Sequence, residues 1–256
     1  MKIKFICIIT GIFFIAHSKA QQFISKAVIE YEVTSNIQKT MGNFSWREML
    51  KENMPKFKTG YYTFTFANDK SVYKFDHWDD QSRKIPDFLK KGEEENVWYS
   101  DYSTGKLNMQ KNIWGSNLNI EDSVRRPEWR ITNENRLIAG FNCRKAFARI
   151  FDSVYVYAFY TDEILISGGP CSITGLPGMI LGLTIPRLYT SWIATKVVIT
   201  GVNESEIKPI HAKKTITLEN LKLTVIDHTK DWFIDDPALN QEIQQQKART
   251  LWATLL

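Results

Sequence analysis

The sequence predicts an all-β protein built around an antiparallel sheet. Aromatic residues make up 13% of its 256 residues, and many of them alternate with polar residues, a pattern typical of strands. Such segments follow one another at short intervals with few helical patterns between them, which favours an antiparallel sheet or an open barrel. The chain shows no internal repeat, low-complexity linker or clear boundary, so residues 21–256 are predicted to form a single β-rich domain.

Regular alternation identifies the first strands. Apolar residues occupy one face of residues 27–34, and glutamates and a threonine occupy the other, as expected of a half-buried strand. Two hairpins are predicted next, the first from residues 61–67 and 71–75, the second from residues 97–102 and 106–111. Between them, residues 78–95 have mixed charge and one proline and are predicted to be a long loop with a short helix.

The strongest β pattern lies in residues 129–160. Residues 154–160 are apolar on both faces and are therefore predicted to lie in the middle of the sheet. Three later segments continue the series of predicted strands: residues 192–200, 214–218 and 223–227.

Two helices are predicted from their N-terminal signals. Ser45 and Glu48 form a capping box, and the helix that they open is expected to end near Pro55. Asp236 and Pro237 supply an N-cap and a proline at the first helical position, and apolar residues follow at helical spacing. The predicted fold is thus a strongly curved sheet with one or two short helices and a C-terminal helix.

The first 20 residues have the three parts of a signal peptide. Lys2 and Lys4 supply a positive start, and residues 5–16 form an apolar run that is too short to span a bilayer. Small residues precede Gln21, so cleavage is predicted before it and the chain is predicted to be exported. No later segment is long and apolar enough to predict a transmembrane helix in the mature chain.

Charge argues against a nucleic-acid partner. The formal net charge of +5 falls to +3 when Lys2 and Lys4 leave with the leader, and the remaining basic residues are spread along the chain. The sequence therefore lacks the clustered basic residues typical of a nucleic-acid-binding face.

Cys143 and Cys171 are the two cysteines that remain after the leader is removed. In an oxidising compartment such a pair is a disulfide candidate, and two separate buried or free thiols are the alternative. Neither cysteine has CxxC spacing or a nearby histidine in sequence, which argues against a metal or redox centre. A catalytic thiolate is a third interpretation, supported only by the basic Arg144 and Lys145 beside Cys143.

Residues 168–183 differ from everything around them. Pro177 and Gly178 suit the central positions of a type II turn, because proline fixes φ and glycine accepts a positive φ. An apolar run starts directly at Met179, so a tight turn that leads into a buried strand is predicted. Gly182 inside that strand indicates a bulge or a close backbone approach. The competing interpretation is an exposed recognition loop.

This segment resembles the GLPGLI family, also called Porph_ging. The family's namesake motif here consists of Gly175, Leu176, Pro177, Gly178, Met179 and Ile180. Methionine replaces the family's leucine, a substitution that conserves volume. The resemblance extends to residues 140–146, 160–164 and 168–170, and covers the chain from about residue 137 to residue 199.

The resemblance implies an exported envelope protein of Bacteroidetes-type bacteria, in the periplasm or associated with the outer membrane. Family members are often encoded beside outer-membrane transport genes, so the expected partner is an outer-membrane transport component or an apolar ligand. The resemblance also suggests an open half-barrel like those of periplasmic lipoprotein carriers. The family has no established activity, catalytic residue or cofactor, and none is assigned here.

Catalytic signatures are weak in this sequence. It contains no HExxH, GxSxG, phosphate-binding loop or dinucleotide fingerprint. Asp76, His77 and Asp79 are the best metal candidates, but on a strand Asp76 would face away from the other two. A solvated strand end is the alternative interpretation, and no cofactor is expected.

Export, strand aromatics and weak catalytic signatures predict a binding or accessory module that holds an apolar ligand or an outer-membrane partner. The alternative is a hydrolase whose site is assembled from distant residues. An apolar groove lined by aromatic residues would favour binding, and a polar cleft where a histidine meets carboxylates would favour the hydrolase.

Overall fold

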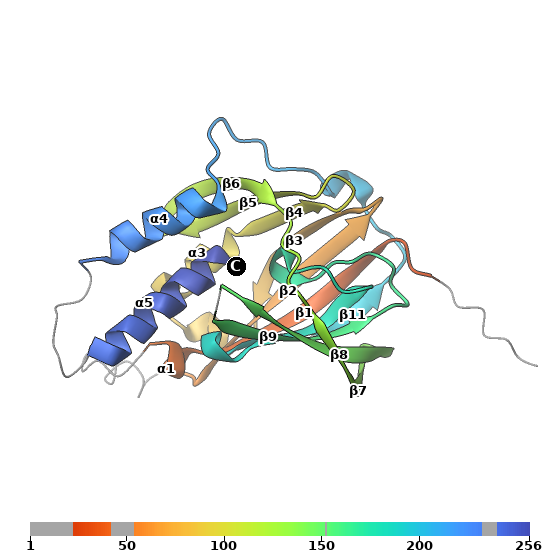
Figure 1. The fold of residues 1–256 in the computed structure, drawn as a ribbon, viewed down its shortest axis with the longest axis horizontal. Helices are drawn as coiled ribbons and strands as arrows, with labels where there is room; N and C mark the ends of the chain where they lie inside the picture. The colour runs from red at the N-terminus through yellow and green to blue at the C-terminus, as the bar shows by residue number, and fades with distance from the viewer. Residues whose placement is uncertain (1–22, 42–53, 152, 232–239) are drawn as a thin grey trace, which may run out of the picture.

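A computed structural model describes residues 23–41, 54–151, 153–231 and 240–256. Eleven strands of these residues form one antiparallel sheet, in the order β6-β5-β4-β3-β2-β1-β11-β10-β9-β8-β7. The sheet is open, with its edges at β6 and β7 (Figure 1). The predicted all-β, antiparallel fold is confirmed.

Most strands pair with their neighbours in sequence. The strands are β1 Ala27–Asn36, β2 Phe57–Ala67, β3 Lys70–Trp78, β4 Val97–Asp101, β5 Lys106–Ile113, β6 Ser116–Ser123, β7 Arg130–Ile138, β8 Phe141–Ile150, β9 Val154–Thr161, β10 Met179–Ile185 and β11 Thr190–Val198. The exception to sequential pairing is β11, which returns to pair with β1 and joins the two halves of the sheet.

The sheet is strongly curved. Figure 1 shows β4–β6 and β7–β9 on opposite sides of the central strands, with α5 lying across the opening of the curve. Register shifts interrupt four of the strand pairs, between Glu30 and Tyr31, between Tyr61 and Tyr62, between Ile180 and Gly182, and between Ile131 and Asn135. Irregularities of this kind bend a strand and increase its twist, so they contribute to the curvature.

Helical segments are short until the C-terminal part of the chain. They are α1 Ile37–Thr40, α3 Lys91–Glu94, α4 Leu218–Thr229 and α5 Asn240–Leu255, with 3₁₀ turns η1 Ser82–Lys84, η2 Asp87–Leu89, η3 Pro170–Ser172, η4 Pro186–Leu188 and η5 Glu204–Glu206. α4 and α5 pack on each other, α4 also contacts β6, and α5 contacts η4. The predicted C-terminal helix is therefore present.

The core lies on the concave face of the sheet. In β1, Ala27, Ile29 and Tyr31 are buried and alternate with partly exposed residues, as the sequence pattern predicts. Aromatic residues of the next three strands extend this layer: Tyr62, Phe64, Phe66, Tyr73 and Trp98. The Tyr31 hydroxyl donates to the carbonyl of Ile180 at 2.5 Å, which ties β1 to β10 across the core.

Two of the predicted strands are wrong. Residues 223–227 lie inside α4, where the Thr217 side chain accepts a hydrogen bond from the Asn220 amide as an N-cap. Leu221 and Val225 are buried four residues apart, so a helical period accounts for the apolar residues of this segment. Within residues 214–218, Ile216 forms an isolated bridge to Ile120 of β6 instead of joining a strand.

Two strands differ from expectation in other ways. β6 was not predicted, because Ser116–Ser123 is mostly polar and lies at an edge, where only Ile120 is buried. β9 lies between β8 and β10, inside the sheet as predicted. Its faces nevertheless differ, since Val156 is buried and Tyr155 is half exposed.

Several predictions fall outside the described residues: the leader at residues 1–20, the capping box of Ser45 and Glu48, and the N-cap at Asp236. Among the helices that the structure describes, none combines the length and the apolarity needed to cross a bilayer. The segment 78–95, predicted as a loop with a short helix, contains η1, η2 and α3.

Candidate functional site

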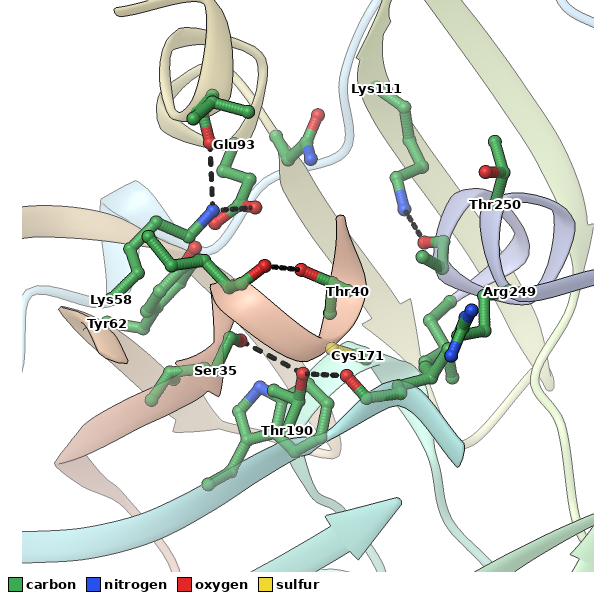
Figure 2. A pocket seen from close by; sticks show the side chains of 18 of the residues that line it. Ser35, Thr40, Lys58, Tyr62, Glu93, Lys111, Cys171, Thr190, Arg249 and Thr250 are labelled. Carbon is green, nitrogen blue, oxygen red and sulfur yellow. Dashed lines mark hydrogen bonds and ion pairs between the residues drawn. The ribbon is translucent and has the colours of Figure 1, made fainter. Parts of the chain in front are cut away.

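A hollow lies between the concave face of the sheet and α5. Its volume is about 410 Å³, within the range of about 300–1,000 Å³ that is typical of small-molecule sites. Residues of β1–β5 and β11 line it on the sheet side, and residues of α1, α3 and α5 line it on the other sides. We call this hollow the concave pocket; Figure 2 shows it from close by.

Aromatic rings dominate the sheet side of the concave pocket. Tyr62 and Tyr73 are stacked with their ring centroids 5.2 Å apart, and Tyr73 meets Trp98 at the same separation. Trp192 of β11 and Leu188 of η4 extend the apolar wall. Burial raises the pKa of Tyr62 and of Tyr73 well above the usual value for tyrosine, so both hydroxyls stay protonated.

One ion pair lies at the edge of the pocket. The Lys58 ammonium group contacts the Glu93 carboxylate at 2.5 Å and donates to the Leu89 carbonyl at 2.9 Å (Figure 2). The Lys58 side chain is almost completely buried, whereas Glu93 is partly exposed. Both charges of this pair therefore have a partner.

Lys111 of β5 brings a second ammonium group into the pocket, with only 4% of the residue exposed. Its Nζ donates to the Ala253 carbonyl at the long distance of 3.4 Å and lies 5.0 Å from the centre of the Trp98 ring. Burial lowers the pKa of Lys111 to about 8; Cys171 and Glu93 oppose this lowering, and Arg125 adds to it. Among the described residues no acidic side chain forms an ion pair with Lys111.

Two further polar groups of the pocket lack partners. Arg249 of α5 donates to the Gln246 side chain at 3.1 Å, but its Nε is buried without a hydrogen-bond partner in the described residues. The Tyr73 hydroxyl also lacks a hydrogen bond of good geometry to any described residue, although Trp192 lies close enough to lower the pKa of Tyr73. Leaving a buried donor or acceptor unpaired costs about 1–3 kcal/mol, so these two groups lower the stability of the fold.

Cys171 also lines the concave pocket, and the predicted disulfide is wrong. Cys143 and Cys171 are both free and buried. Cys143 lies on β8 close to Glu163, whereas Cys171 lies in η3 close to Lys111. The two thiols therefore lie in different surroundings. Burial raises the pKa of each thiol to about 12, which also argues against a catalytic thiolate.

The GLPGMI motif lies next to the pocket as part of the core. Leu176 is buried, and Met179 and Ile180 are completely inaccessible to solvent. The motif thus leads into a buried strand as predicted, and the exposed recognition loop is not supported. Of the two features predicted for Gly182, a bulge or a close backbone approach, the structure shows the bulge, since a register shift precedes it. A Cβ there would also lie 2.9 Å from the Ile138 side chain.

The turn at Pro177 and Gly178 is tighter than the type II turn that was predicted. The amide of Gly178 donates to the carbonyl of Leu176 at 2.8 Å, which closes a three-residue turn around Pro177. Gly178 has a φ of 141°, and a Cβ there would collide with the carbonyl oxygen of Thr161. The position therefore requires glycine for two independent reasons.

The weak metal candidates do not come together. His77 Nδ1 lies 2.8 Å from Asp76, and the imidazole stacks on the Tyr61 ring, while the Asp79 carboxylate accepts from the Ser82 amide. In the described ranges, no three histidine, cysteine, aspartate or glutamate side chains converge as metal ligands would.

The residues that characterise the pocket were not singled out from the sequence, although two of them carry a signal there. Lys58 shares the inward face of β2 with Tyr62 and Phe64, and Lys111 shares the inward face of β5 with Met109. A lysine at an inward position of an otherwise apolar strand face is uncommon in a folded protein. Arg249 carries no such signal, because its place in the pocket depends on how α5 packs.

The strands around the pocket form an open, curved antiparallel sheet, and the chain as a whole is similar to several solved structures. The chain is similar to PNGF-II in a P2₁ crystal form, with 13% identity over 78% of this chain and 33% of that chain and a TM-score of 0.51. For PNGF-II in a C2 form the corresponding values are 14%, 75%, 30% and 0.48. An uncharacterized conserved protein from Thermus thermophilus is 8% identical over 74% of this chain and 90% of that one, with a TM-score of 0.38.

The likeness to the P2₁ form shows the fold alone, and the chain spans about a third of the length of PNGF-II. No protein-family model and no curated protein matches the sequence.

Proposed function

We propose that this chain is a binding module that holds an apolar ligand in the concave pocket. The supporting observation is a hollow of about 410 Å³ that is lined by Tyr62, Tyr73, Trp98 and Trp192 and bordered by α5 on the side opposite the sheet. Aromatic rings in a protein core are normally packed closely against other side chains. Rings that line a void of this size lack those contacts on one side. A ligand would restore them.

The hydrolase alternative has less support. A hydrolase of that kind needs a polar cleft in which a histidine meets carboxylates. The one carboxylate that the described residues contribute to the concave pocket, Glu93, is instead paired with Lys58. No histidine that the structure describes lines this pocket: His77 stacks on Tyr61 and His228 on Trp114.

We further propose that the protein is exported and belongs to the GLPGLI family, with the motif as a core element rather than a binding loop. The burial of Leu176, Met179 and Ile180 supports a structural role for the motif. Edman sequencing of protein secreted or exported by a bacterial host tests the export. A start at Gln21 is expected, and a start at Met1 would contradict it.

The binding proposal is tested with N-phenyl-1-naphthylamine, a neutral fluorescent probe of apolar sites. We expect saturable binding of one probe per chain with blue-shifted emission. Thr250→Trp, which places an indole in the pocket from α5, is expected to weaken binding at least tenfold, since Thr250 lines the pocket. Gln245→Trp on the exposed face of the same helix is the matched control and should bind as the parent does. Equal binding by both variants would contradict the proposal.

A further inference from the structure

The concave pocket carries more positive than negative charge. Lys58, Lys111 and Arg249 line it, and among the described residues Glu93 is its one acidic side chain. Glu93 is engaged by Lys58, with the two groups 2.5 Å apart. Lys111 and Arg249 are thus left without an acidic partner in the described part of the chain.

The two unpaired cations lie on the same side of the pocket. In Figure 2 the Lys111 and Arg249 side chains both lie beside α5, while Lys58 and Glu93 lie across the pocket from them. Lys111 donates to Ala253 of α5, and Arg249 belongs to α5 itself. The aromatic wall of Tyr62, Tyr73 and Trp192 faces the same space from the sheet. The two cations without an acidic partner therefore lie along α5, and the aromatic wall faces them from the sheet.

Lys111 also lines a second, more polar hollow of about 740 Å³. This hollow lies between η2, α3 and β5, and it shares Glu93, Asn96, Thr250 and Ala253 with the concave pocket. The ammonium group of Lys111 therefore stands where an apolar space meets a polar one. A polar head group bound next to Lys111 would therefore remain accessible to solvent through the second hollow.

The other charged and titratable groups around Lys111 cannot balance it. Arg125 is a cation that donates to the Leu255 carbonyl at 2.7 Å, and its pKa is lowered to about 10 by burial. The Cys171 thiol stays protonated because burial raises its pKa to about 12. A buried cation without an acidic partner lowers the stability of the folded protein, and a bound anion would remove that penalty.

We propose that the ligand is an amphiphile with one negatively charged head group, a carboxylate or a phosphate, which Lys111 and Arg249 bind while its alkyl chain packs against the aromatic wall of the pocket. This inference rests on the proposed binding function and adds the chemical class of the ligand. Hydrogen bonds between charged groups are about twice as strong as neutral ones, so the head group sets the preference among ligands that share one chain.

The test compares four ligands with the same 12-carbon chain: dodecanoate, dodecyl phosphate, neutral dodecanol and cationic dodecyltrimethylammonium. Each displaces N-phenyl-1-naphthylamine from the full chain at pH 7, below the critical micelle concentration. We expect at least one of the two anions to bind tenfold or more tightly than dodecanol, and the cation to bind less tightly than dodecanol. Which anion binds better distinguishes a carboxylate from a phosphate head group.

Substitutions show which residues cause the preference for anionic ligands over dodecanol. Lys111→Met keeps the length of the side chain and removes its charge; with it the ratio of anion to dodecanol affinity should fall to about twofold or less. Arg249→Met should lower the same ratio in part. Lys106→Met, on the exposed face of the same strand, is the control and should keep the full ratio.

Failure of this inference and failure of the proposed function give different results. If dodecanol binds as tightly as both anions, or if the preference persists in Lys111→Met and in Arg249→Met, the anionic head group is refuted and the apolar site stands. If the probe and all four ligands fail to bind to folded protein, the proposed function is refuted and this inference falls with it.

Discussion

The motif segment, residues 168–183, and the concave pocket lie side by side and are built in opposite ways. In the motif segment the buried polar groups have partners: the Thr174 hydroxyl donates to the Arg125 carbonyl at 2.8 Å, and the Ser172 hydroxyl lies 3.1 Å from that of Ser100. In the concave pocket, Arg249 Nε and the Tyr73 hydroxyl are buried without a partner among the described residues, and Lys111 has one long hydrogen bond.

This difference separates the part of the molecule that stabilises the fold from the part that we propose binds a ligand. Fully paired, close-packed segments add stability, whereas buried unpaired groups lower it. Substitutions in the two regions should therefore change stability in opposite directions. The segment most distinctive in sequence is structural, and the pocket is assembled from residues that lie far apart in the chain.

The largest expected effect is in the motif segment, at Gly178. Gly178→Val should lower the free energy of unfolding by at least about 4 kcal/mol, because it adds a Cβ against the Thr161 carbonyl and forces a β-branched residue to a φ of 141°. Gly178→Asn should cost nearly as much, since asparagine tolerates a φ near +57° and the Cβ collision remains. Urea unfolding monitored by circular dichroism gives both values.

Gly105→Asn is the matched control for this prediction. Gly105 has a φ of 70°, and a Cβ there would meet nothing within 4 Å. We expect a loss below about 1 kcal/mol. A Gly178→Asn variant as stable as Gly105→Asn would contradict the steric account of the motif.

Met179→Ser should have the next largest effect in the same segment. Met179 is completely buried, and the change removes apolar contacts and buries a hydroxyl, so a loss of about 3 kcal/mol is expected. Leu165→Ser, at a position in the preceding loop that is 59% exposed, should cost less than about 0.5 kcal/mol. An unchanged denaturation midpoint for Met179→Ser would restore the recognition-loop interpretation.

In the pocket, Lys111→Met should stabilise the protein, on the order of 2 kcal/mol at pH 7, because methionine removes a buried charge at similar volume. Burial lowers the pKa of Lys111 to about 8, from 10.5. The penalty is therefore fully present below pH 8 and is relieved as the pH rises towards the pKa of the unfolded chain. The advantage of the variant should shrink between pH 8 and pH 10.

Lys106→Met provides the comparison on the same strand, with an exposed side chain, and should leave stability within about 0.5 kcal/mol of the parent. If Lys111→Met destabilises the ligand-free protein at pH 7, Lys111 contributes to the fold and the contrast between the two regions fails.

The smallest effect is expected for the thiols, of which Cys171 belongs both to the motif segment and to the pocket lining. Neither Cys143 nor Cys171 should react quickly with iodoacetamide at pH 8 in the folded protein, because both are buried with a pKa of about 12. In unreduced, denatured protein both should be alkylated completely, as peptide mass spectrometry would show. Peptides joined through Cys143 and Cys171 would contradict the structure.

Local signals were enough to predict much of the fold. The alternation in β1 and the turn residues Asn68 and Asp69 identify strands without knowledge of their partners. The failures also have local causes: residues 223–227 have an apolar pattern that a helix also satisfies, and β6 is a polar edge strand. The return of β11 to β1 could not be predicted, because pairing between distant strands leaves no mark in either one.

The pocket was less predictable than the fold. Lys111 at an inward position of β5 is a usable signal, since the pattern of Leu107, Met109 and Ile113 places it among buried residues. Arg249 and Trp192 come together only because α5 lies over the concave face of the sheet. The predicted disulfide failed because sequence reports the number of cysteines but not the distance between them.

A crystal structure of the protein with 12-bromododecanol tests the central claim, that the concave pocket holds an apolar ligand, most directly. The ligand is neutral, so the result does not depend on the head group. The account predicts an anomalous bromine peak inside the pocket, between the rings of Trp98 and Trp192. A bromine peak elsewhere on the molecule, or a pocket filled by its own side chains in crystals soaked to saturation, would contradict it.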